Sequence, residues 1–75
     1  MDKETELYYR HLTDMFRSEG WKLLSEEFNS DVKALQDIDA IKTEQDLYYH
    51  KGQLCILHSL LNLEATIELM REEHD

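Results

Sequence analysis

Twelve consecutive residues without a charge, Gly52-Gln-Leu-Cys-Ile-Leu-His-Ser-Leu-Leu-Asn-Leu63, decide the fold of this chain. The rest of the 75 residues is rich in charge: the chain is 33% charged and has a formal net charge of -9. The stretch is too short to cross a bilayer, which takes about 20 apolar residues. As a helix it would be apolar on more than one side, so we expect it to pack between helices of its own chain or to be shared with another chain.

The composition predicts a single all-α domain over residues 1–75. The chain has no proline and only two glycines, Gly20 and Gly52, and it is rich in residues that favour helices. It lacks the Asn-Gly, Asp-Gly and proline turns that a sheet of short strands would need. A chain this small is rarely stable on one core alone, and its single cysteine, Cys55, can form no intrachain disulfide. We therefore expect a homo-oligomer.

The first half of the chain carries two apolar stripes of different phase. The apolar positions are Tyr8, Leu12, Met15 and Phe16 before Gly20, and Trp21, Leu24, Phe28, Val32, Leu35 and Ile38 after it. The spacing within each set predicts a helix, and the change of phase predicts a bend at Gly20. We expect one long, bent first helix; a break into two helices is the alternative.

A second helix is expected from about residue 44 to about residue 73. Thr43 and Asp46 form a Thr-x-x-acid pattern, which predicts Thr43 as the N-cap and Glu44 as the first helical residue. Asp37 and Asp39 oppose the dipole at the end of the first helix and favour its termination there. A connection of about 4 to 6 residues joins antiparallel neighbours, so the sequence predicts a coiled-coil-like helical hairpin.

Two apolar stripes run along the predicted second helix. One holds Leu47, Leu54, Leu57, Leu61, Ala65 and Leu69, and the other holds Tyr49, Gly52, Ile56, Leu60, Leu63, Ile67 and Met70. Tyr49, Ile56, Leu63 and Met70 repeat every seven residues, which is typical of a coiled-coil seam. We assign this second stripe to the contact with the first helix and the first stripe to another chain. The expected interface residues are Trp21, Leu47, Leu54, Leu57, His58, Leu61 and Ala65.

The sequence holds no pattern that predicts an enzyme, a metal site or a cofactor. The Glu-x-x-His spacing of di-iron bundles is absent, and so are Gly-rich phosphate loops and Ser/His/Asp arrangements. Cys55 has no activating base nearby and is interpreted as a small buried apolar side chain. Gly52 is interpreted as a point where the two hairpin helices, or a neighbouring chain, approach closely. The net charge of -9 argues against nucleic acid and against an anionic membrane as partners.

Three segments resemble small acidic proteins encoded among the structural genes of tailed bacteriophages. They are Glu19-Gly-Trp-Lys22, Leu47-Tyr-Tyr-His-Lys-Gly-Gln-Leu54 and Leu60-Leu-Asn-Leu63, and the resemblance spans about residues 20–69. It implies a phage origin, no catalytic residues, and a role in binding a phage structural protein or a host protein. We expect a small structural or assembly-associated protein, located in the host cytoplasm during infection or in the virion. The alternative is an acidic inhibitor that binds a host enzyme or defence protein, imitating DNA.

Overall fold

The computed structural model describes residues 2–74 and confirms an all-α fold, with no strand in that range. The elements are α1 (Lys3–Phe16), α2 (Glu19–Leu35), a single 3-10 turn η1 (Ile38–Ala40), α3 (Glu44–Leu61) and α4 (Leu63–His74). The prediction of two long helices was wrong, because each of them is divided in two. In the first half the structure follows the alternative, a break into two helices.

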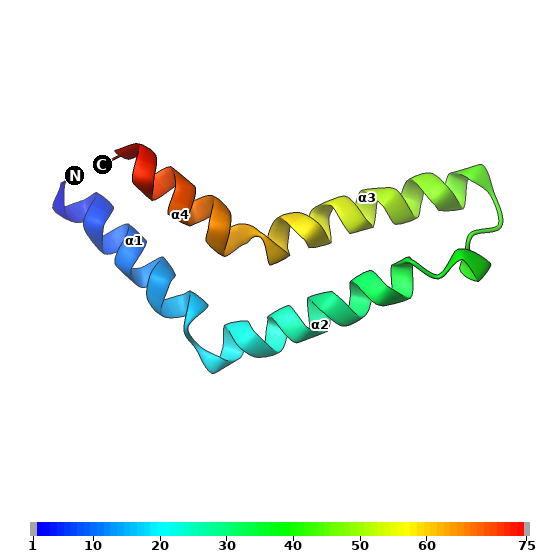
Figure 1. Ribbon diagram of the computed structural model, residues 1–75, viewed down its shortest axis with the longest axis horizontal. Coiled ribbons are helices and arrows are strands. Elements are labelled where there is room, and N and C mark those ends of the chain that lie inside the picture. The colour runs from blue at the N-terminus through cyan, green and yellow to red at the C-terminus, as the bar shows by residue number, and fades with distance from the viewer. Residues whose placement is uncertain (1, 75) are drawn as a thin grey trace.

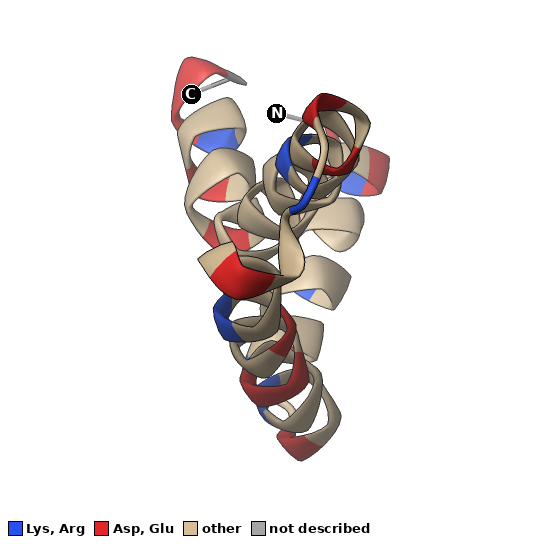
Figure 2. Cartoon of the chain, turned by 90° about the vertical axis from the view of Figure 1, so that its right-hand side faces the viewer, with Lys and Arg blue, Asp and Glu red and all other residues tan. Residues whose placement is uncertain are grey.

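The four helices form two bent arms that lie side by side in one layer (Figure 1). The first arm is α1 and α2, and the second arm, α3 and α4, returns beside it, so that α2 packs on α3 and α1 on α4. The molecule measures 52 × 25 × 14 Å, and Figure 2 shows the thin layer edge-on. Its smallest extent is close to the diameter of one helix with its side chains, about 10–12 Å. The fold therefore has a single layer of helices.

The first arm bends at Arg17 and Ser18, just before the predicted position at Gly20. Ser18 is extended and serves as the N-cap of α2, its Oγ accepting a hydrogen bond from the Trp21 backbone N–H at 3.2 Å. The same hydroxyl donates to the carbonyl of Met15 at 2.6 Å, near the end of α1. Gly20 lies inside the first turn of α2, where an added Cβ would meet only the Ser18 hydroxyl, at 3.9 Å. The bend thus comes from a serine cap.

Aromatic side chains fix the angle of this bend. The ring of Trp21 lies 5.1 Å from that of Phe16, across the bend, and 6.4 Å from that of Phe28, one to two turns further along α2. Both pairs are edge-to-face, the arrangement that aromatic quadrupoles favour. Trp21 is half-buried as a result.

The start of the second arm confirms the predicted cap. The Oγ1 of Thr43 accepts from the Asp46 backbone N–H at 3.0 Å, and α3 begins at Glu44. The connection runs over residues 36–43 and is longer than expected because it contains η1, which Asp37 caps. A hydrogen bond of 3.1 Å joins the arms here: the Nδ1 of His50 donates to the carbonyl of Leu35, the last residue of α2. A carbonyl can only accept, so the imidazole carries its proton on Nδ1.

The second arm bends at Asn62, a position at which the sequence predicted a continuous helix. Asn62 ends α3, its backbone N–H donating to the carbonyl of His58, and its own carbonyl accepts from the Thr66 backbone N–H in the first turn of α4. The two arms bend in the same direction and at neighbouring places in the layer (Figure 1), so α4 runs beside α1 as α3 runs beside α2. The second bend thus lets the second arm keep its contact with the first arm on both sides of the first bend.

Candidate functional site

Along α3, the two stripes have the opposite roles to those predicted. Leu54, Leu57 and Leu61 are half-buried, and Leu57 lines a groove with side chains of α2. Tyr49 is 68% exposed and Ile56 is 64% exposed. The assignment of the Tyr49 and Ile56 stripe to the contact with the first helix was therefore wrong for α3.

Along α4, the stripes exchange roles. Leu63 and Ile67, from the stripe that is exposed on α3, are half-buried where α4 packs on α1. Ala65 and Leu69, from the other stripe, are exposed. The exchange follows from the break at Asn62. The helix axis changes direction there, so α4 turns a different side toward the first arm than α3 does, although the apolar spacing continues unchanged. Neither stripe is therefore buried over its whole length.

The predicted interface residues do not form one surface. Leu54, Leu57 and Leu61 take part in the packing of α3 on α2, and Trp21 packs between two phenylalanines. Leu47, His58 and Ala65 are exposed, although Leu47 only to 37%. The predicted set is thus divided between the packing of α3 on α2 and the exposed surface, and its role in contact with a second chain stays a prediction.

Two further interpretations are corrected by the structure. Cys55 is exposed, because it lies two positions before Leu57 and so on the opposite side of α3 from α2. Gly52 is also exposed, and a Cβ added there would meet nothing within 4 Å. Gly52 therefore plays no part in bringing the two arms together, and the alternative, contact with a neighbouring chain, stays a prediction.

One broad face of the layer is apolar. Five exposed apolar side chains each directly precede a buried or half-buried residue: Tyr8, Met15, Leu24, Tyr49 and Ile56. Each residue turns the side-chain direction by about 100°. The two arms run in opposite directions, and their inward side chains also point in opposite directions. These two reversals cancel, so the residue before an inward one points to the same broad face in both arms. We call these five side chains, from three helices, the apolar face.

The opposite broad face carries the basic side chains. Outside the connection between α2 and α3, five Lys and Arg residues each directly follow a buried or half-buried residue: Arg10, Arg17, Lys22, Lys33 and Lys51. By the same rotation they point away from the apolar face. We call this side the charged face. These five apolar and five basic side chains thus lie on opposite broad faces, and the same rotation places Glu27 and Asp31 on the apolar face.

A shallow groove of about 410 Å³ opens on the apolar face between α2 and α3. Its walls are Asp31, Ala34 and Leu35 from α2, and Gln53, Ile56 and Leu57 from α3. Half-buried leucines form its floor, and the exposed side chain of Ile56 stands at its margin. An apolar side chain from a partner could therefore enter the groove beside Ile56.

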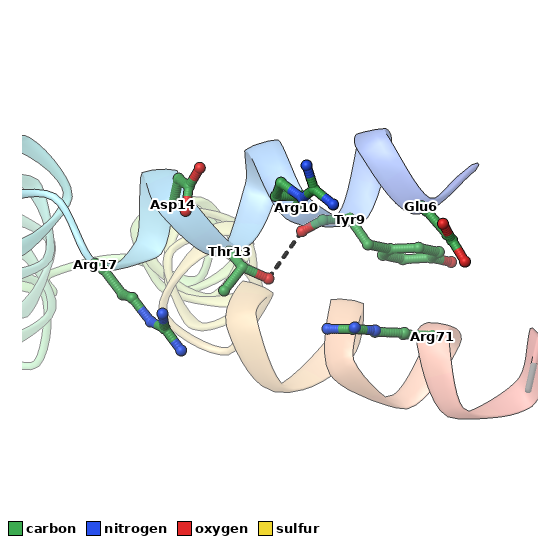
Figure 3. Close-up of a pocket in the computed structure, with 7 residues that line it drawn as sticks. All are labelled: Glu6, Tyr9, Arg10, Thr13, Asp14, Arg17 and Arg71. Atoms are coloured by element: carbon green, nitrogen blue, oxygen red, sulfur yellow. Dashed lines mark hydrogen bonds between the residues drawn. The ribbon is translucent and has the colours of Figure 1, made fainter. Parts of the chain in front are cut away.

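A polar hollow of about 330 Å³ lies between α1 and α4 (Figure 3). Its lining is made of Glu6, Tyr9, Arg10, Thr13 and Asp14 from α1, the C-cap residue Arg17, and Arg71 from α4. The Thr13 hydroxyl donates to the Tyr9 carbonyl at 2.8 Å, so its proton is used within the helix. Two carboxylates among three guanidinium groups offset most of the positive charge. The hollow thus has the mixed charge of a solvated face and lacks the excess of positive charge that an anion site needs.

Within residues 2–74, no group of three His, Cys, Asp or Glu side chains is placed to hold a metal ion. No helix there has the length and the apolar content needed to span a membrane. The apolar face is therefore the surface feature with the strongest claim to a function.

Comparison with known proteins gives no relative from which a function could be transferred. No protein-family model, no curated protein and no solved structure matches this chain. The proposed function therefore rests on the sequence and on the geometry of the two faces.

Proposed function

We propose that this protein is a non-enzymatic protein–protein interaction module that works as an oligomer. One observation carries the proposal: among residues 2–74, twelve large apolar side chains are exposed, and five of them lie on the apolar face. Soluble monomers rarely leave contiguous apolar surface uncovered, and such surface usually marks a binding site. Only Tyr9 and Val32 are buried among the side chains that the structure describes, and neither is fully buried, so the packing within one chain is slight.

The resemblance to small phage-encoded proteins supports a structural or assembly-associated role. In that role the partner would be another phage protein, met in the host cytoplasm or in the virion. The alternative, an acidic inhibitor that imitates DNA, would need carboxylates gathered on one surface. Asp and Glu instead occur in every α-helix, with Lys and Arg interspersed among them (Figure 2). This dispersal supports the assembly role over the inhibitor.

Two measurements test the proposal. Light scattering on the purified chain should give a mass of at least twice the 9.0 kDa of one copy. A single copy at every concentration would contradict the oligomer. Affinity capture from infected cells should recover a phage structural or assembly protein, and recovery of a host enzyme in its place would favour the inhibitor.

A further inference from the structure

The surface area of one copy is large for its mass. The chain exposes 6144 Å². A compact monomer of 9.0 kDa exposes about 4,850 Å² by the scaling of folded monomers, so this chain has an excess of about 1,300 Å². A standard interface covers about 800 Å² on each partner, which is less than the excess. The radius of gyration agrees, at 16.3 Å against about 11 Å for a compact chain of this length.

The thickness of the layer indicates what the partner supplies. Stable domains consist of two or more packed layers, and this molecule has one, 14 Å across. Its apolar face is built like the inner face of one half of a helical bundle, with Tyr8, Met15, Leu24, Tyr49 and Ile56 outside the packing of the single chain. A second layer of helices over this face would bury these five side chains. The charged face would then remain in water.

We propose that a second copy of this chain supplies that layer, packing its own apolar face against this one to form a two-layer bundle of four arms. The inference rests on the proposed function, since it names the surface through which the oligomer forms. The five basic residues of the charged face point away from the contact, and no Lys or Arg is among the five side chains that define the apolar face. The contact is therefore made mainly by apolar burial, with the carboxylates of Glu27 and Asp31 on the same face beside it.

The net charge of the chain predicts opposite salt dependences for binding a second copy and for binding a basic partner. Each copy has a formal charge of -9, so two copies repel at long range and salt reduces that repulsion. Association of two copies through the apolar face should strengthen as salt is raised. A basic partner held by the carboxylates would show the opposite dependence. Self-association that weakens with salt would overturn the proposal.

The test compares two positions on one exposed stretch of α3. Ile56 lies on the apolar face and His58, two residues on, lies beyond Leu57 toward the charged face; both are exposed. Ile56→Asp should weaken the dimer at least about 30-fold, the scale of a central interface residue, and His58→Asp should leave it within a few-fold. Analytical ultracentrifugation over a dilution series measures both, and circular dichroism shows whether helicity is kept.

A second measurement covers the case in which Ile56→Asp fails to fold. In a Cys55→Ser chain, a cysteine is placed by Ile56→Cys or by His58→Cys, and its rate of maleimide labelling is followed as protein concentration rises. Position 56 should become protected in the dimer and position 58 should stay reactive. Protection at 58 alone would overturn the apolar-face contact while the oligomer stands. A wild-type chain that stays monomeric would remove the proposed oligomer as well.

Discussion

Ser18→Ala removes both side-chain hydrogen bonds at the bend between α1 and α2. The hydroxyl accepts from the Trp21 N–H at 3.2 Å and donates to the Met15 carbonyl at 2.6 Å. Loss of an N-cap of this kind costs about 1 kcal/mol. The whole domain is stabilised by about 4–11 kcal/mol at the usual 0.05–0.15 kcal/mol per residue. For a domain of this size the loss should lower the Tm by about 4–8 °C.

The assay is thermal unfolding followed by circular dichroism at one fixed protein concentration, because the proposed dimer would make the Tm depend on concentration. Ser18→Asn keeps a side-chain acceptor at the cap and should retain most of the stability. Ser30→Ala, an exposed change within α2, is the matched control and should leave the Tm unchanged or slightly raised. A Tm for Ser18→Ala equal to that of the wild type would refute the serine-capped bend, and so would an equal loss in Ser18→Asn.

Three further outcomes are expected from the geometry of single side chains. Cys55 is exposed on the side of α3 away from α2 and off the apolar face, so a thiol reagent should label it equally in dimer and monomer; protection in the dimer would move the contact to that edge. Asp2 accepts from the Thr5 backbone N–H at 2.8 Å, which holds the pKa of its carboxyl below the ordinary 3.8. A lowered folded-state pKa gives stability that is present above the unfolded pKa and is lost as the pH falls through the folded pKa. Urea unfolding below about pH 4 should show this loss, and Asp2→Asn should abolish that component while keeping the cap. His50→Ala removes the hydrogen bond to the Leu35 carbonyl and should cost about 1 kcal/mol in urea unfolding; an unchanged midpoint would show that water replaces the imidazole without loss.

Local features of the sequence determined the start of α3 and the approximate position of the first bend. Thr43 and Asp46 predicted the start of α3 to the residue, because a cap is a hydrogen bond between neighbours along the chain. The change of apolar phase near Gly20 located the first bend within about a turn. The absence of proline and of turn dipeptides was enough for the all-α fold. Each of these conclusions depends on residues within a few positions of one another.

Only the tertiary structure decided which stripe each helix buries. Both stripes of residues 44–73 are apolar and periodic, and an isolated helix gives no reason to prefer one. The choice depends on how the helix is rotated about its axis against the first arm, and that rotation changes at Asn62, where α4 has to follow the bend set by Ser18 in α1 and α2. Ile56 is exposed and Ile67 half-buried for this reason, although both belong to one stripe. Periodicity is a property of one segment, whereas its phase relative to a partner is fixed only by packing between segments far apart in the chain.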